Sequence, residues 1–492
     1  MFRILGLALS LMLVAGAQET APAPQPPARR APPKPHVNAP LGEIKSMPGD
    51  GAGAYKTRQY RDLFAEQGHS SAETQAKIGK AVRQFFHGDG QEERVYFETG
   101  ANENGPLAYI TDWANNDARS EGMSYGMMIA VQMDKKREFD AIWNWSKTYM
   151  LITDPHNPSV GYFAWSMNTD GTPRATGAAP DGEEFFVMAL YFASHRWGNG
   201  EGIYNYQAEA DKLLRGMRHH PVLTATGPFR IHPEDEPFIQ PNRPWPSPNN
   251  AARLKALAAS GAPAPGPRAP APWEARSISI GPMVDEDHFM IRFVPNVDMT
   301  FTDPSYHLPA FYEVWARVGP SSEAGFWREA AETSRDFWER AANPGTGLVP
   351  DYADFDGRPK PRKTDAGGGD FRYDAWRAAM NWSVDYAWWA ADKRAIARSD
   401  RLQAFFDGQG LGVYGNRFHL DGGLLGKDHS LGLVACNAVA SLAASNARAW
   451  RFVDELWDAR PPHGTWRYYD GMLYLMSLLE LSGQLRPYFP SP

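Results

Sequence analysis

Residues 180–190 read Pro180-Asp181-Gly182-Glu183-Glu184-Phe185-Phe186-Val187-Met188-Ala189-Leu190. Proline and acidic residues stand where a helix is expected to begin, and an uninterrupted apolar run follows them. The same arrangement occurs twice more. Glu121 precedes the apolar run at 127–131, and Asp303-Pro304 precedes apolar side chains between 308 and 315 that share one helical face. The sequence therefore predicts several helices that each begin beside a carboxylate.

Helical patterning recurs along most of the chain, while the alternation typical of strands is scarce. Residues 292–302 are the one segment where we expect a short strand. No fixed-period repeat is found, which disfavours a solenoid. The helical stretches number twelve, and they predict an all-α fold of six αα-hairpins, arranged as an irregular bundle or closed into a toroid. They lie near 70–88, 121–133, 136–152, 182–196, 206–218, 305–318, 322–341, 374–391, 397–407, 432–445, 449–458 and 466–483.

The composition excludes several classes of function. The 492 residues carry a net charge of −7, so no global positive field attracts nucleic acid. The single cysteine, Cys436, excludes an intrachain disulfide and a cysteine-based metal cage, and its apolar surroundings predict a packed core residue. Seventeen tryptophans suit the flat faces of a ligand, although most of them are expected in the core.

The N-terminus predicts export. Arg3 precedes an apolar run at 4–15, and small residues at 15–17 supply a cleavage pattern. We therefore expect a signal peptide at 1–17 and a Pro/Ala-rich linker at 18–50; an uncleaved membrane anchor is the alternative. One domain is expected over 51–492, with a long Pro-rich surface insertion at about 221–275. The predicted location is the periplasm or the medium, with no membrane span after cleavage, and we expect a monomer.

Each of the three carboxylates has an ordinary structural explanation. Asp303 before a proline is typical of an N-cap. Asp181, with Glu184 three residues later, is similar to a capping box. Glu121 would place a negative charge in a first helical turn, where the helix dipole favours it.

Their neighbours favour a function as well. Glycine inside a helix costs about 0.5–1 kcal/mol, so glycines beside these carboxylates indicate that a ligand or another backbone approaches closely. Aromatic residues cluster around the same segments. The glycines are Gly122, Gly126 and Gly182, and the aromatics are Tyr109, Trp113, Tyr125, Tyr162, Trp165 and Tyr306.

Helix starts that converge at one end of a toroid would bring these carboxylates together. One protonated and one ionised carboxyl group form the catalytic pair of a glycoside hydrolase. A helix N-terminus favours the charged form, so burial against aromatics and a neighbouring carboxylate must raise the pKa of the acid.

Three segments of this sequence resemble motifs of glycoside hydrolase family 8. Residues 119–128 (RSEGMSYGMM) look like its acid-bearing motif, 179–198 (APDGEEFFVMALYFASHRWG) resemble its signature, and 301–309 (FTDPSYHLP) are similar to its base-bearing segment. The likeness runs from about Tyr55 to Phe489. The most similar subgroup is the reducing-end xylose-releasing exo-oligoxylanases.

The resemblance implies an (α/α)6 barrel that hydrolyses β-1,4-xylosidic bonds of xylo-oligosaccharides with inversion, without a metal or cofactor. Glu121 matches the general acid and Asp303 the general base, while Asp181 matches the residue that holds and distorts the central sugar. Trp165 is expected either as a stacking platform for sugar or as core. Asp374 and Arg377 orient substrate or form a buried ion pair. The full set of substrate-binding residues is Arg119, Tyr125, Trp165, Tyr306, Asp374, Arg377 and His429.

One departure concerns the loop that closes the site beyond the reducing-end sugar. The exo-acting subgroup has Leu-His-Pro there, whereas this chain has Asp428-His429-Ser430. His429 is expected to bind the terminal sugar, and the subgroup favours release of xylose from the reducing end. The alternatives are an endo-acting xylanase or β-1,4-glucanase, a toroid that binds glycans without cleaving them, and a toroid lyase of uronic polymers.

Overall fold

The computed structural model describes residues 52–226, 277–363 and 365–488. The predicted signal peptide and linker, and residues 227–275 of the predicted insertion, lie outside this description. The described residues all belong to one compact unit, Asn38–Pro492. None of the helices described is both long and apolar enough for a bilayer span.

Helices dominate, as the sequence predicted. Within the described residues, twelve helices of nine residues or more correspond to the twelve predicted stretches, and two single-turn helices precede them, α1 (Ala54–Thr57) and α2 (Leu63–Glu66). The twelve are α3 (Ser71–His87), α4 (Ser120–Gln132), α5 (Lys136–Trp145), α6 (Pro180–Trp197), α7 (Tyr206–His219), α9 (Pro309–Val318), α10 (Ala324–Ala341), α11 (Ala375–Trp389), α12 (Arg394–Gln409), α13 (Leu431–Val439), α14 (Ala449–Asp458) and α15 (Arg467–Leu481).

These helices alternate between two kinds. Helix α3 is amphipathic and buries six side chains at spacings of one, three and four residues, which is one face of a helix. Helix α4 is buried all round except at Glu121, as expected for a helix inside a core. Helices α6, α11, α13 and α15 are likewise buried almost all round, and α9, the sixth inner helix, buries seven of its ten residues. The chain therefore passes from an outer helix to an inner one six times.

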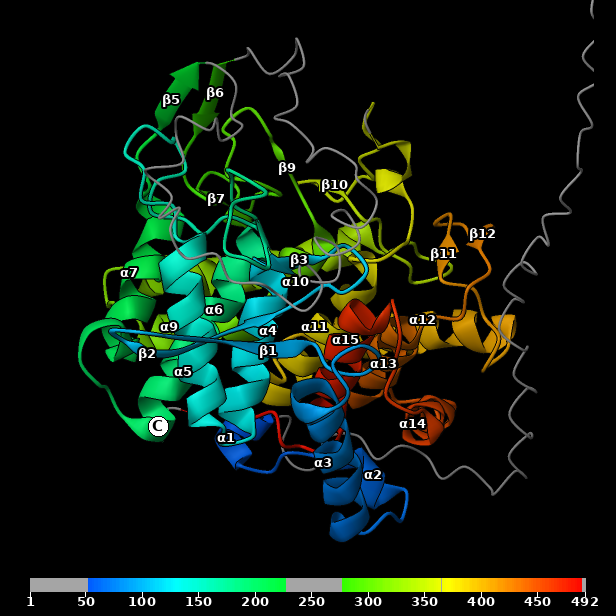
Figure 1. Cartoon of the computed structure of the whole chain (residues 1–492). Helices are drawn as coiled ribbons and strands as arrows, with labels where there is room; N and C mark the ends of the chain where they lie inside the picture. The colour runs from blue at the N-terminus through cyan, green and yellow to red at the C-terminus, as the bar shows by residue number, and fades with distance from the viewer. Residues whose placement is uncertain (1–51, 227–276, 364, 489–492) are drawn as a thin grey trace, which may run out of the picture. The chain divides into compact units, whose positions relative to one another are not determined.

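The inner helices close into a ring. Helix α4 packs on α6, α6 on α9, α9 on α11, α11 on α13, α13 on α15, and α15 on α4 again. Figure 1 shows α4, α15 and α13 side by side within this ring. Outer helices α5, α7, α10, α12 and α14 each pack on an inner neighbour. The fold is an (α/α)6 barrel, which excludes the irregular bundle.

Chain direction places the beginnings of the inner helices together. Contacts between helix starts show that the inner helices run the same way. The Leu431 N–H of α13 donates to Asp470 of α15, the Tyr468 hydroxyl of α15 to Glu121 of α4, and Arg377 of α11 to Asp181 of α6. Their N-termini consequently share one end of the ring. The positive ends of six helix dipoles meet there, which favours negative side chains at that end.

Strands are more numerous than the sequence indicated, although the short strand expected within 292–302 is present as β9 (Phe301–Thr302). All described strands form two-stranded antiparallel sheets, and most have two to four residues, too few to show an alternating pattern. Only β9 lies in the expected segment. The pairs are β1 (Tyr96–Asn102) with β2 (Gly105–Ile110), β3 (Asp117–Arg119) with β4 (Ser166–Asn168), β5 (Leu223–Thr226) with β6 (Ser277–Ile280), β7 (Val284–Asp285) with β8 (Met290–Ile291), β9 (Phe301–Thr302) with β10 (Ala353–Asp354), and β11 (Arg417–Phe418) with β12 (Leu424–Gly426).

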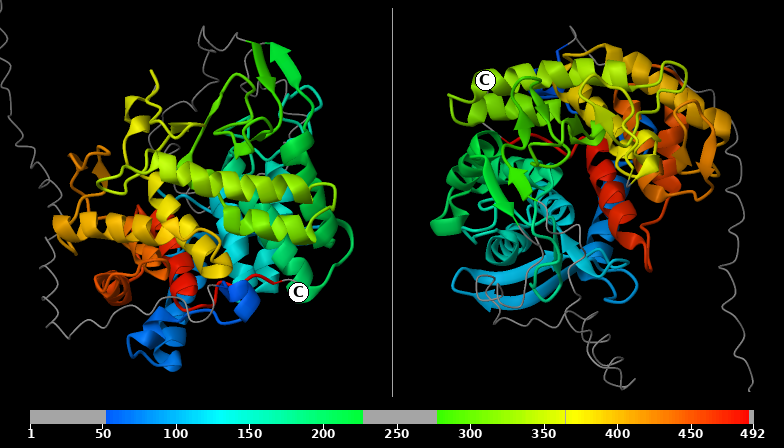
Figure 2. Two further views of the ribbon diagram at one scale, coloured as in Figure 1. Left: turned by 180° about the vertical axis from the view of Figure 1, so that it is seen from behind. Right: turned by 90° about the horizontal axis from the view of Figure 1, so that it is seen from above.

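Hairpin β5–β6 frames the predicted insertion. Its register pairs Leu223 with Ile280 and Thr226 with Ser277, so the chain leaves and re-enters the domain at adjacent points. The hairpin lies above the helices in Figure 1 and in the left view of Figure 2. The first residues of the expected insertion are thus part of the folded domain.

The three helix glycines make room mainly for other parts of the protein itself. A Cβ added to Gly182 would lie 2.4 Å from Oγ of Ser120, so this glycine lets the first turns of α4 and α6 touch. A Cβ on Gly126 would meet Ile110 at 2.7 Å. The sequence predicted that a ligand or another backbone approaches these glycines closely. The groups that approach them are side chains of the protein itself and, at Gly182, also the backbone of Ser120.

Candidate active site

The predicted catalytic carboxylates all lie where inner helices begin. Glu121 is the second residue of α4, and Asp181 is the second residue of α6. Asp303 directly precedes the 3-10 turn η5 (Pro304–Tyr306), which leads into α9, and Asp374 directly precedes α11. The barrel therefore brings together acidic side chains that lie up to 253 positions apart in the sequence.

Arg377 contacts three of these four carboxylates, those of Glu121, Asp181 and Asp374. Its Nη1 donates hydrogen bonds to Oε2 of Glu121 (2.9 Å) and to Oδ2 of Asp181 (3.2 Å). The same nitrogen lies 2.6 Å from the Tyr125 hydroxyl, and Nη2 forms an ion pair with Asp374 at 3.1 Å. Arg377 is buried. The ion pair that the sequence offered as one interpretation of Asp374 and Arg377 is present, with Arg377 buried and the Asp374 side chain 31% exposed; a role of both residues in orienting substrate stays a prediction.

Glu121 has the pKa that a general acid needs. Burial raises the pKa of its carboxyl group to about 7; Arg377 opposes this shift, and the charges of Asp181 and Asp374 reinforce it. A second contact comes from Tyr468, whose hydroxyl donates to Oε1 at 2.9 Å. The requirement that burial and a neighbouring carboxylate raise this pKa is thus met.

Asp303 is a cap and also keeps one oxygen free of hydrogen bonds from described residues. Its Oδ1 accepts the N–H of Ser305 at 2.7 Å, which confirms the predicted N-cap. Its Oδ2 is buried and has no hydrogen-bond partner in the described part of the chain. Burial raises the pKa of Asp303 well above its usual range, and the charges of Asp374 and Asp351 raise it further. Arg377 and the Ser305 N–H act in the opposite direction.

The predicted capping box at Asp181 is absent. The N-cap of α6 is Ala179, without a side-chain hydrogen bond, and Asp181 accepts the N–H of Gly182 instead. Glu184 turns into the core, where its Oε1 accepts the hydroxyl hydrogen of Tyr312 at 2.7 Å. The sequence spacing of a capping box does not form one here because Pro180 already occupies the first helical position.

Comparisons with known proteins identify the family. Residues 103–240 and 293–482 match the model of the glycosyl hydrolases family 8. The chain belongs to glycoside hydrolase family 8. It is therefore a glycoside hydrolase, and the resemblance seen in the sequence is confirmed.

Several family 8 proteins are similar over nearly the whole domain. The reducing-end xylose-releasing exo-oligoxylanase Rex8A of Paenibacillus barcinonensis is 38% identical over 443 residues, covering 89% of this chain and 99% of that protein. A crystal structure of a family 8 xylobiose complex from Teredinibacter turnerae superposes with a TM-score of 0.78 at 47% identity, covering 89% of this chain and all of that one. A xylohexaose complex of a catalytic mutant xylanase from the same organism gives the same values.

Trp165 and Arg119 lie together at the start of α4, where the Trp165 carbonyl accepts the Ser120 N–H at 3.0 Å. The indole of Trp165 is 43% exposed, so the core interpretation of this residue is wrong. The Arg119 guanidinium lies 5.8 Å from the centroid of that ring and pairs with Asp112 and Asp117. An exposed indole held by a neighbouring cation is free to stack on a sugar face.

Tyr125 and Tyr306 are buried more deeply. Each is less than 5% exposed, and Tyr125 packs edge-on against Phe185. The ring of Tyr306 lies 5.9 Å from the Arg377 guanidinium. Both tyrosines therefore lie next to the Arg377 guanidinium, which contacts Glu121, Asp181 and Asp374.

His429 is held by protein groups on both ring nitrogens. Nδ1 lies 2.9 Å from the carbonyl oxygen of Tyr414, and Nε2 lies 3.3 Å from Oε1 of Glu455. Burial opposes protonation, but the hydrogen bonds to Glu455 and Tyr414 raise the pKa of His429 above its ordinary value. The imidazole is 29% exposed, so one edge of it faces outward.

Sequence reasoning missed the tyrosine pair at the beginning of α15. Tyr468 contacts Glu121, and the Tyr469 hydroxyl donates to the Tyr373 carbonyl at 3.1 Å. The signal was present, because these residues begin the last predicted helix as the three carboxylates begin earlier ones. A polar residue at a helix start is a distinct signal, whereas an aromatic pair does not stand out in a chain with 17 tryptophans, 20 tyrosines and 25 phenylalanines.

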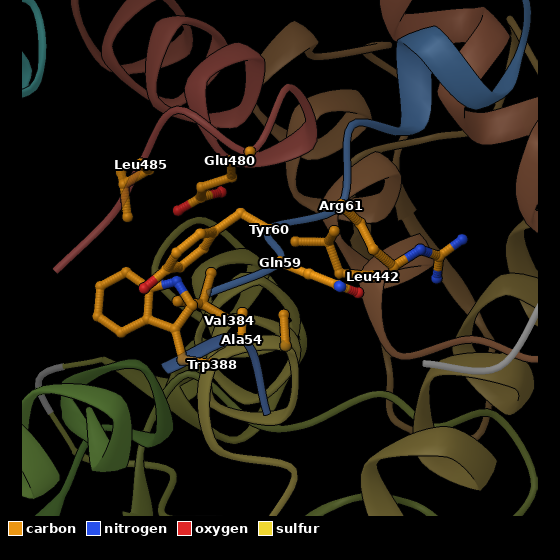
Figure 3. Close-up of a pocket in the computed structure, with 11 residues that line it drawn as sticks. Ala54, Gln59, Tyr60, Arg61, Val384, Trp388, Leu442, Glu480 and Leu485 are labelled. Atoms are coloured by element: carbon orange, nitrogen blue, oxygen red, sulfur yellow. The ribbon is translucent and has the colours of Figure 1, made fainter. Parts of the chain in front are cut away.

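A narrow cavity elsewhere in the barrel is unrelated to this chemistry. Figure 3 shows Tyr60, Trp388, Glu480 and Leu485 around it. Trp388 and Glu480 lie near the C-terminal ends of α11 and α15, whereas the predicted catalytic carboxylates lie at the N-terminal ends of inner helices. The described residues place no group of three or more His, Cys, Asp or Glu side chains where they would hold a metal ion.

Proposed function

We propose that this enzyme hydrolyses β-1,4-xylosidic bonds of xylo-oligosaccharides with inversion and releases xylose from the reducing end. The observation that carries the proposal is the contrast between two carboxyl groups at one end of the ring. Glu121 has a pKa of about 7 and accepts hydrogen bonds from Arg377 and Tyr468. Asp303 keeps one carboxyl oxygen without a hydrogen-bond partner among the described residues. The 38% identity to Rex8A, a reducing-end xylose-releasing exo-oligoxylanase, supports the choice of substrate.

In the proposed mechanism the two carboxyl groups work on opposite faces of the sugar. Glu121 donates its proton to the glycosidic oxygen, and the bond from that oxygen to the anomeric carbon breaks. Water attacks the same carbon from the other face and gives a proton to Oδ2 of Asp303. Burial and the charges of Asp374 and Asp351 raise the pKa of Asp303 overall. Arg377 and the Ser305 N–H oppose this rise, and they are the groups that favour the ionised form that this step requires.

Asp181 is proposed to hold and distort the sugar at the point of cleavage. Its carboxylate is fixed from two sides, by the Gly182 N–H at 2.9 Å and by Arg377 at 3.2 Å. Trp165 with Arg119 supplies the stacking platform. Tyr125, Tyr306, Asp374 and Arg377 shape the site around these groups.

Endo-acting xylanase activity is the second candidate. The family 8 xylanase from Teredinibacter turnerae was crystallised with xylohexaose and is 47% identical to this chain. In addition, His429 is tied to Glu455 and Tyr414, and Asp428 and Ser430 replace the apolar and rigid neighbours of the exo-acting subgroup. A site that is open beyond the first reducing-end sugar would accept longer chains.

A digest of xylotetraose labelled at its reducing-end carbon separates the candidates. Labelled xylose with unlabelled xylotriose supports release from the reducing end, whereas label in xylobiose and longer products supports endo action. No cleavage of xylotetraose would refute both. Proton NMR during the first turnovers should show the α-anomer at the newly formed reducing end, because inversion of a β-bond gives it. Glu121→Gln and Asp303→Asn are the inactive controls.

Export to the periplasm or the medium is proposed from the sequence of residues 1–17. N-terminal sequencing of the protein recovered outside the cytoplasm tests it. A mature chain that begins at Gln18 is the expected result, and recovery of the full-length chain in the membrane fraction would contradict it.

A further inference from the structure

The side chain of Tyr468 occupies the space next to Gly122, which directly follows Glu121 in the sequence. Its ring is 3% exposed, and its hydroxyl donates to Oε1 of Glu121 at 2.9 Å. A Cβ added to Gly122 would lie 2.5 Å from both the hydroxyl oxygen and Cε2 of Tyr468. A side chain at position 122 is therefore incompatible with the tyrosine, and this glycine lets the hydroxyl reach the neighbouring carboxyl group.

The two oxygens of Glu121 are not equivalent. Oε2 accepts a hydrogen bond from Arg377, and a guanidinium has donors only, so a proton on Oε2 would face another proton. Oε1 faces the Tyr468 hydroxyl, which donates to a carboxylate and accepts from a carboxylic acid. The proton of the neutral acid is therefore on Oε1, the side of the carboxyl group that Tyr468 contacts.

We propose that Tyr468 is a positioning residue for the general acid, which keeps the reactive proton on Oε1 and stabilises the carboxylate left after its transfer. The inference rests on the proposed hydrolysis and on Glu121 as the acid. The proton passes from Oε1 to the leaving oxygen, which takes the electron pair of the broken bond. The Tyr468 hydroxyl then rotates to donate to Oε1, and it neither gains nor loses a proton.

The hydroxyl keeps its hydrogen throughout. Burial raises the pKa of Tyr468 well above its usual range, and the charge of Glu121 raises it further. Replacing Tyr468 with Phe removes this one donor and leaves the other charged and titratable groups that act on Glu121 in place. These are Arg377 on α11, Asp374 directly before it, Asp181 on α6, Arg119 on β3, Tyr125 on α4 and Tyr469 on α15.

The test compares two substrates whose leaving groups differ in their need for a proton. Xylotriose needs a protonated leaving oxygen, whereas 2,4-dinitrophenyl β-xylobioside releases a stable phenolate without one. For Tyr468→Phe we expect kcat on xylotriose to fall about 10- to 100-fold, at the lower end of what acid catalysis contributes. We expect less than about a threefold change in KM and in activity on the dinitrophenyl substrate. Without the donor the ionised form of Glu121 is less stable, so the alkaline limb of the pH profile moves to higher pH.

Tyr474→Phe is the matched control. It also removes a buried hydroxyl from α15, one that donates to the Ala459 carbonyl at 3.1 Å, and it should leave both substrates and the pH profile unchanged. Gly122→Ala displaces the Tyr468 ring without altering its chemistry and should give the same selective loss on xylotriose. It provides the comparison if Tyr468→Phe does not fold.

Two results would overturn the inference. One is an equal loss on both substrates, which indicates a general disturbance of the site. The other is unchanged kcat on xylotriose with an unmoved pH profile. The proposed function fails in a different way, because the unaltered enzyme would then not cleave xylotriose at all.

Discussion

Replacing Arg377 with methionine tests how the buried charges at the site are balanced. The change preserves side-chain length but removes the guanidinium that contacts Glu121 and Asp181 and pairs with Asp374. Removing one partner of a buried ion pair costs about 3–5 kcal/mol, because the other charge stays buried without compensation. We expect the free energy of unfolding at pH 8 to fall by about this amount.

The loss should depend on pH in a definite direction. Burial raises the pKa of Glu121 and of Asp181. Of the groups that oppose this rise, Arg377 has the largest effect on both residues. Without it, the pKa of both groups in the folded state rises further above the unfolded value. Stability from such groups is present below the unfolded pKa and is lost as pH rises through the folded pKa. The loss in free energy of unfolding caused by Arg377→Met should therefore be small near pH 5 and grow toward pH 8.

Urea unfolding at pH 5 and pH 8, followed by circular dichroism, measures this difference. Arg335→Met is the matched control, since Arg335 forms a buried pair with Asp385 at 2.8 Å outside the site. The control should be destabilised too, yet keep the pH profile of kcat/KM. An Arg377→Met deficit that is equal at pH 5 and pH 8 would refute the charge-balance reasoning.

Three further predictions follow from the geometry. The proposed general acid, Glu121, must act in its protonated form, and its pKa is about 7, so kcat/KM on xylotriose should decline about tenfold per pH unit above that value; a profile flat to pH 9 would contradict the assignment. Gly182→Ala places a Cβ 2.4 Å from the Ser120 hydroxyl oxygen, so overpacking should cost about 1–3 kcal/mol in thermal or urea unfolding and lower kcat by separating α4 from α6. Trp165→Ala removes a ring that is 43% exposed, so the unfolding midpoint should hardly move while KM rises about three- to tenfold, corresponding to about 0.5–1.5 kcal/mol of stacking; an unchanged KM would exclude it as a sugar platform.

The helices were predictable because each carries its own signal. Apolar residues at helical spacing mark the outer helices, and continuous apolar runs behind an acidic start mark inner ones such as α6. Most of the short strands were not predictable. Segments such as Phe301–Thr302 pair only because the barrel brings Ala353–Asp354 beside them, and two residues show no pattern.

The site was predictable in its parts and not in its contacts. Sequence motifs pointed to Glu121, Asp181 and Asp303, but the capping box inferred from the spacing of Asp181 and Glu184 did not form. No spacing rule connects Tyr468 with Glu121, which lie 347 positions apart. The role of Gly122 becomes clear only when the Tyr468 ring is seen against it.

The sequence by itself determined the family, the twelve helices and the identity of the acidic residues at their beginnings, because these are local patterns of side chains. Tertiary structure decided which groups touch, and therefore the electrostatics. Closing six parallel inner helices into a ring buries Arg377 among the carboxylates and raises the pKa of Glu121 to about 7. Burial and the charges of distant residues set that value, and both exist only after the ring has closed.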